Sequence, residues 1–138
     1  MKTLVMVCAI AAITCGCSNN ATPTSPTTTV TTPAPILFAG TLQPHTSRFY
    51  SYKLTSAGTV TALLASLEKN GAPASNSLEL GIGVPAGTGC AVTAVAYTSA
   101  TLQPQLREDY STGTYCVRIS DVDGLPQAMS FTIRVIHP

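Results

Sequence analysis

Apolar residues occur at every second position through most of residues 36 to 138, which is the spacing of strands that bury one face. Turns rich in glycine, proline and asparagine separate these alternating stretches. The strands that this pattern predicts cover residues 36–42, 48–54, 59–67, 78–84, 91–98, 115–119 and 131–136. A helix over residues 60–69 is an open alternative, because the inward face of that stretch is ambiguous. Seven or eight short strands at this spacing predict an all-β fold, an antiparallel two-sheet β-sandwich.

The same alternation predicts which side chains point into the sandwich. The inward positions that it defines are Tyr50, Tyr52, Leu54, Leu78, Leu80, Ile82, Val84, Tyr115, Val117 and Ile119. Cys116 is then expected on the face opposite Tyr115 and Val117. Glu108 and Asp109 are expected in a loop.

The first residues have the pattern of an export signal. Lys2 precedes an uncharged ten-residue run, Leu4 to Ile13, whereas a helix that spans a bilayer needs about 20 apolar residues. The run is therefore predicted to be a secretory signal peptide rather than a membrane span. Residues 18–35, which follow it, hold seven Thr, four Pro and no charge. Such a composition does not pack, and it predicts a tether over residues 17–35 that reaches at most about 55 Å.

The end of the apolar run, Thr14-Cys15-Gly16-Cys17-Ser18, resembles a bacterial lipobox. That resemblance implies that residues 1–16 are cleaved off and that the Cys17 thiol receives a lipid. An ordinary signal peptide, with Cys17 an incidental thiol, is the alternative. Ser18 stands where an Asp would resemble an inner-membrane retention signal, so an outer-membrane location is favoured.

Five stretches of the domain together resemble the bacterial pre-peptidase C-terminal domain; they read FAGTLQP, SRFYSYKLTSAGTVTALL, LELGIG, STGTYCVRISD and SFTIRVIHP. The resemblance covers nearly all of residues 36–138 and implies a jelly-roll-like β-sandwich of the kind appended to secreted peptidases and other exported hydrolases. No peptidase precedes the domain here, so no protease-linked role is expected. An immunoglobulin domain is the rival fold. The absence of Trp, and Tyr115 lying directly before Cys116 rather than two residues before it, count against that rival.

Cys90 and Cys116 are the two cysteines of the domain. Export to an oxidising compartment favours a disulfide between them. The closed loop of 27 residues predicts about 3.5 kcal/mol of stabilisation. A reactive or metal-binding thiol is the alternative, but no histidine stands near either cysteine in the sequence.

Residues that could catalyse a reaction are few. The domain has two histidines, His45 and His137, and no G-x-S-x-G or H-E-x-x-H motif. Asp121-Val122-Asp123-Gly124 begins like a calcium loop, but no Glu follows at the required distance, so a turn is favoured. We therefore expect no enzyme activity, no metal site and no cofactor.

Charge and aromatic residues narrow the choice of partner. Seven basic and six acidic residues give a net charge of +1, which argues against nucleic-acid binding. An exposed tyrosine can stack on a sugar or anchor a peptide, and the strand pattern leaves Tyr97 and Tyr110 least constrained, although half-buried packing is favoured for both.

The sequence thus predicts a bacterial cell-envelope lipoprotein that is held to the membrane by lipid on Cys17. Its β-sandwich is expected to be a non-catalytic module for binding or adhesion to an envelope protein or a glycan. The alternative is a structural or accessory lipoprotein that assists export or assembly of another envelope protein. A small hydrolase is a third and disfavoured hypothesis, because acid and base residues are scarce.

Overall fold

A computed structural model describes residues 34–138; the predicted signal peptide, Cys17 and the tether up to residue 33 lie outside the described residues. The described part forms nine strands: β1 (Ile36–Leu42), β2 (Ser47–Leu54), β3 (Gly58–Lys69), β4 (Ala72–Pro73), β5 (Leu78–Ala86), β6 (Gly89–Thr98), β7 (Leu106–Tyr110), β8 (Gly113–Ser120) and β9 (Met129–Ile136). None of these elements is a helix with the length and apolarity needed to cross a membrane.

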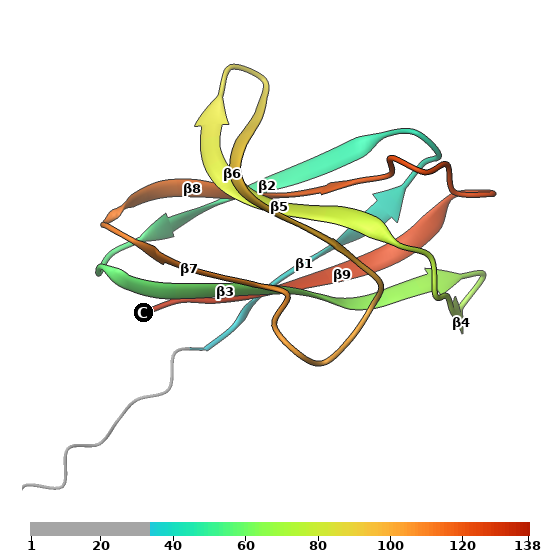
Figure 1. The fold of residues 1–138 in the computed structure, drawn as a ribbon, viewed down its shortest axis with the longest axis horizontal. Coiled ribbons are helices and arrows are strands. Elements are labelled where there is room, and N and C mark those ends of the chain that lie inside the picture. The colour runs from blue at the N-terminus through green and yellow to red at the C-terminus, as the bar shows by residue number, and fades with distance from the viewer. Residues whose placement is uncertain (1–33) are drawn as a thin grey trace, which may run out of the picture. The chain divides into compact units, whose positions relative to one another are not determined.

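The strands form two antiparallel sheets packed face to face (Figure 1). Sheet A runs β1-β9-β3, with β7 and the two-residue β4 pairing with separate parts of β3, and sheet B runs β2-β8-β5-β6. Successive long strands alternate between the sheets except at the β5–β6 hairpin, and the first and last strands pair with each other. This order is that of a jelly roll and differs from the immunoglobulin arrangement. The predicted antiparallel two-sheet sandwich is therefore confirmed.

Three local expectations differ from the structure. Residues 58–69 form strand β3, so the helix alternative for this stretch is wrong. Glu108 and Asp109 lie in strand β7 rather than in a loop, because β7 pairs with β3 despite its charged sequence. Val84 shares its alternation with Ile82 but is 44 % exposed, because β5 runs past the edge of the core into the β5–β6 hairpin.

The core lies between the two sheets and is built from the inward positions of every long strand. Its largest fully buried side chains are Leu42, Leu54, Leu64, Leu67, Leu78, Leu80, Ile82, Ile119, Met129, Phe131 and Ile133. Leu63 is also buried, but it is not part of this cluster. The predicted burial of Tyr52 and Tyr115 is confirmed, and Tyr50 is half-buried against the same cluster. The Tyr115 hydroxyl donates to the carbonyl oxygen of Ser111 at 3.0 Å, which fixes the turn before β8.

Cys90 and Cys116 form the disulfide that the sequence predicts, and their Cα atoms are 5.9 Å apart. The bond joins β6 to β8, although β5 lies between these strands. In a regular sheet, two strand spacings would separate the Cα atoms of Cys90 and Cys116 by about 10 Å. Because the observed separation is 5.9 Å, the beginning of β6 bends across β5. Gly83 permits this close approach, because a Cβ atom there would collide with the carbonyl of Ala91.

Candidate functional site

The His, Cys, Asp and Glu side chains of the described residues do not gather into a metal-binding group. No three His, Cys, Asp or Glu side chains within residues 34–138 lie close enough to hold an ion. The structure keeps the two histidines apart: His45 lies in the turn before β2, whereas the His137 ring stacks on Tyr52 near the other end of that strand, with ring centroids 5.9 Å apart.

Asp121 holds a turn, as the sequence favoured over a calcium loop. One carboxylate oxygen accepts the amide of Gly124 at 2.9 Å, and the other accepts those of His45 at 2.7 Å and Leu125 at 2.6 Å. Burial would raise the pKa of Asp121, but these three amides outweigh it and hold the pKa below its usual value. The side chain therefore joins the β1–β2 turn to the β8–β9 loop, while Asp123 points into solvent.

The two tyrosines that the sequence left unassigned have different environments. Tyr110 is half-buried and packs on Tyr115 with ring centroids 4.6 Å apart, so the expected packing role is confirmed there. For Tyr97 that expectation is wrong, because its side chain is 68 % exposed on the outer face of sheet B. A large aromatic ring so exposed is available to contact another molecule.

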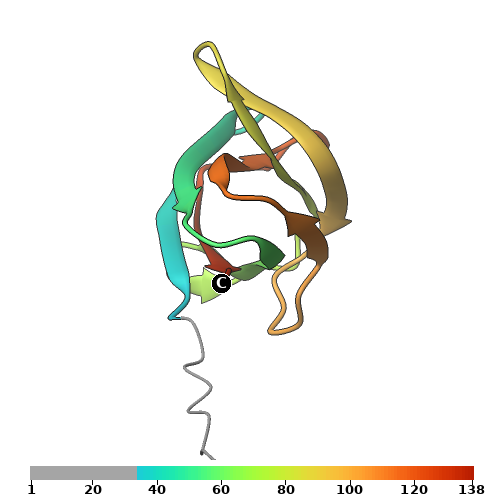
Figure 2. The same cartoon turned by 90° about the vertical axis from the view of Figure 1, so that its left-hand side faces the viewer.

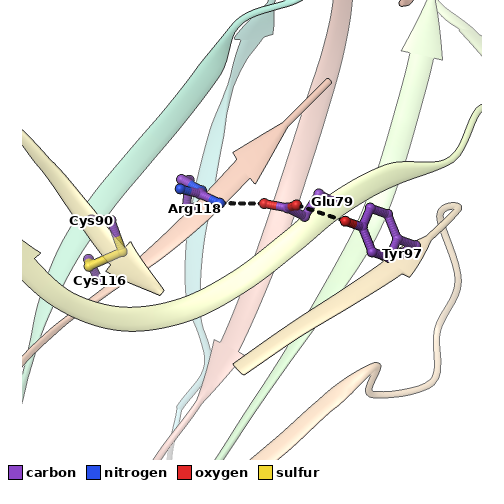
Figure 3. Close-up of polar contacts among 5 residues, drawn as sticks. All are labelled: Glu79, Cys90, Tyr97, Cys116 and Arg118. Carbon is purple, nitrogen blue, oxygen red and sulfur yellow. Dashed lines mark hydrogen bonds and ion pairs between the residues drawn. A yellow bond between two sulfur atoms is a disulfide. The ribbon is translucent and has the colours of Figure 1, made fainter. Parts of the chain in front are cut away.

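Two charged residues hold the Tyr97 ring in place (Figure 3). The Tyr97 hydroxyl donates a hydrogen bond to Glu79 Oε2 at 3.2 Å. Arg118 Nη2 donates a hydrogen bond to Glu79 Oε1, and the two charged side chains form an ion pair. The pKa of Tyr97 is raised, chiefly because its hydroxyl donates to Glu79 and also because that carboxylate is negatively charged. Strands β6, β5 and β8 thus each supply one residue, and the ring is fixed before any partner binds.

Two further apolar side chains are exposed on the same surface. Val95 lies two residues before Tyr97 on β6 and is 43 % exposed, and Phe49 on β2 is 40 % exposed. Phe49 pairs in register with Arg118, which places it on the outer face as well. We call the surface formed by Phe49, Glu79, Val95, Tyr97 and Arg118 the Tyr97 face. Its two aromatic rings are separated by three strand spacings, or about 14 Å across the sheet.

The outer face of sheet A carries a different kind of surface. A shallow groove of about 420 Å³ crosses β1, β9 and β3. Hydroxyl groups of Thr41, Ser66, Ser130 and Thr132 line it together with the carboxylate of Glu68. No exposed aromatic ring borders this groove, since Phe131 at its margin is buried in the core. The groove therefore offers hydroxyl groups and one carboxylate, but no exposed aromatic ring.

The link between Glu79 and Arg118 could not be read from the sequence, since 39 positions separate the two residues. Their side-by-side placement depends on which strands are neighbours in sheet B. The sequence placed Tyr97 in a strand, residues 91–98, but did not assign the face on which its ring lies. Only the strand order shows that this strand lies at an edge, where no loop or strand covers the ring.

Comparison with protein-family models gave no match for this chain, and comparison with curated proteins gave none either. The resemblance to the pre-peptidase C-terminal domain and to a bacterial lipobox therefore rests on the residues quoted for it.

Proposed function

We propose that this protein is a cell-envelope lipoprotein whose β-sandwich is a non-catalytic module for binding an envelope protein or a glycan. The observation that carries the binding role is the Tyr97 ring, which is exposed yet fixed by Glu79 and Arg118. A ring held in one position loses little conformational entropy on contact, and such preorganisation favours recognition.

The anchoring part of the proposal rests on the sequence. Gly16-Cys17 closes an apolar run of export-signal length, and an uncharged Thr- and Pro-rich stretch separates it from the first strand. Lipid on Cys17 would hold the domain at a membrane surface, the outer membrane in a cell with two. Two or more acyl chains are needed for stable anchoring.

Anchoring is tested by replacing Cys17 with Ser in the full chain and fractionating the cells. The variant is expected to lose acyl labelling and to leave the membrane fraction. A Cys15→Ser variant is the matched control, because Cys15 lies two residues before Cys17 after the same apolar run, and it should behave as wild type. Unchanged labelling of the Cys17 variant would refute the anchoring role.

Binding is tested by applying the purified chain to a glycan array and by cross-linking it in envelope extract. Whichever partner is found, Tyr97→Ala should weaken binding by at least about tenfold, since aromatic anchors of interfaces contribute 2 kcal/mol or more. Leu37→Ala is the matched control, because Leu37 is 62 % exposed but lies on sheet A. Equal losses in both variants, or none in either, would refute the Tyr97 face as the site. A complex insensitive to Tyr97 but needed for export of its partner would favour the accessory role.

A further inference from the structure

We infer that strand β6 is a self-association edge, where a second copy of this chain adds its own β6 antiparallel and joins two copies of sheet B into one sheet. An unpaired strand edge is a template for another strand, and proteins normally cover or charge such edges. This inference goes beyond the proposed function and does not rest on it.

Each of the other strand edges in the described residues carries a feature that discourages pairing: a side-chain hydrogen bond, charged residues, a proline or a covering loop. On β1, the Tyr50 hydroxyl donates to the carbonyl oxygen of Ala39 at 3.1 Å. Strand β2 carries Arg48 and Lys53, β7 carries three consecutive charged residues, and β4 contains Pro73. These features discourage pairing with another strand.

Between β7 and β4, the free edge of β3 is covered by the loop that leads from β6 to β7. The amides of Thr101 and Gln105 donate to the carbonyls of Leu64 and Ala62 at 2.9 and 3.0 Å. The Leu64 amide in turn donates to the Gln105 side-chain oxygen at 2.7 Å. The loop and the Gln105 side chain therefore occupy hydrogen-bonding groups on this edge of β3.

Strand β6 lacks such protection over its second half. It forms the outer strand of sheet B and the right-hand margin of the sandwich in Figure 2. Its ten residues contain no charge and no proline. Thr93 lies at a bulge and approaches the Tyr110 hydroxyl at 3.4 Å, which ties the first half of β6 to β7. The five residues that follow, 94–98, have no such tie.

The core beneath this segment is also incompletely covered. Ala94 and Ala96 point inward and pack against the core cluster, but both remain only partly buried. A further strand beside β6 would cover this flank and satisfy the unpaired backbone groups of the edge.

The sequence of the free segment complements itself. When two antiparallel copies are centred on Ala96, Ala96 faces its own counterpart, Ala94 faces Thr98, and Val95 faces Tyr97 of the other copy. Pairs of an aromatic and a β-branched residue are among the favourable cross-strand pairs, and this register makes two of them. No charge opposes a second copy, so a two-fold symmetric contact of this kind closes on itself as a dimer. The Tyr97 faces of the two copies would then form one continuous surface.

The register is tested by replacing Ala96 with Cys in the full chain and following dimers on non-reducing gels. Directly facing residues have Cα atoms about 4.5–5.5 Å apart, which lies within the range that a disulfide accepts. We expect the Ala96→Cys chain to form a reducible dimer at several times the wild-type level. Leu37→Cys is the control, because this exposed residue lies on β1 of the other sheet, and it should give no more dimer than wild type. Equal dimer yields at the two positions would overturn the inference.

Two charge variants provide an independent measurement by sedimentation. Val95→Lys with Tyr97→Lys places like charges opposite each other across the dimer, whereas Val95→Glu with Tyr97→Lys places opposite charges there. Both positions are exposed, so the fold should tolerate either pair of substitutions. The second variant should dimerise about tenfold more strongly than the first, since two cross-strand pairs change together. Indistinguishable dimerisation constants, or a wild-type chain that stays monomeric at high concentration, would overturn it.

Discussion

Asp121 offers the sharpest test of how the loops of this sandwich are held. Its carboxylate is 6 % exposed and accepts three backbone amides from two separate turns. Replacing it with Ala leaves all three amides without their acceptor and removes the side-chain tie between the β1–β2 turn and the β8–β9 loop, whereas the backbone bond from the Asp121 amide to the Thr46 carbonyl at 2.9 Å remains. The substitution therefore tests whether one side chain organises this end of the domain.

The expected loss of unfolding free energy follows from the number of bonds. A hydrogen bond to a charged group contributes about 1.5–3 kcal/mol, and three that share one carboxylate are not additive. We expect Asp121→Ala to cost about 4 kcal/mol, or about 15 °C in Tm for a domain of this size. Asp121→Asn keeps one carbonyl acceptor and should lose about half of that free energy. Asp123→Ala is the matched control on the same loop, and because its side chain is exposed it should change stability by no more than about 0.5 kcal/mol.

The pH dependence has a defined sign. The pKa of Asp121 is lower in the folded state than its ordinary value of 3.8, so its stabilisation is complete above that value. The stabilisation is then lost as the pH falls through the folded-state pKa. Urea denaturation at a series of pH values should show a constant gap between wild type and Asp121→Ala near neutral pH, and a gap that closes below about pH 3.8. A gap equal to that of Asp123→Ala, or one that widens in acid, would refute this reasoning.

Three further predictions concern the disulfide, the hairpin and the domain boundary. Replacing Cys90 and Cys116 with Ser should cost about 3.5 kcal/mol in denaturant melts, and native protein should show no free thiol at either position by mass after alkylation. Gly83→Ala should cost about 3 kcal/mol or more, because the new Cβ collides with β6. Gly89→Ala is the control that should retain the native disulfide, because a Cβ there meets nothing closer than the Ala86 carbonyl oxygen at 3.7 Å. Residues 36–138 alone should melt cooperatively within a few degrees of the chain with its tether, and a molten or helix-rich product would show that the domain needs more than its own core.

The sequence predicted the parts of the fold that depend on local pattern. Strand β1 was expected at the observed bounds, Ile36 to Leu42. Strand β7 was missed, because three of its five residues are charged and only its pairing with β3 makes it a strand. Val84 was assigned to the core, because alternation shows which face a residue has but not where the opposite sheet ends.

For the candidate site, the sequence predicted the strands that carry some of its residues, but not the contacts between those residues. Tyr97 was placed in a strand but expected to be half-buried, because a single sequence does not show whether the strand lies at an edge and leaves the ring exposed. The ion pair that holds the ring depends on Gly81 of β5 lying beside Arg118 of β8, a register set by the whole sheet. Non-local pairing of this kind leaves no signal in a single sequence. The alternation of apolar residues therefore predicted the fold class, but it could not predict which side chains meet on the Tyr97 face.

The pairing of β1 with β9 determines how the domain would respond to mechanical force. Any tension applied through the residues before Ile36 reaches the sandwich by way of β1, whose seven residues pair with β9 from Ile36 with Val135 to Leu42 with Met129. A pull along the strand axis stretches all of these pairs at once, in shear, whereas a sideways pull opens them one at a time from Ile36. Survival under force depends on the unfolding rate. The domain should therefore resist a pull that aligns with β1 far longer than one that peels this strand away.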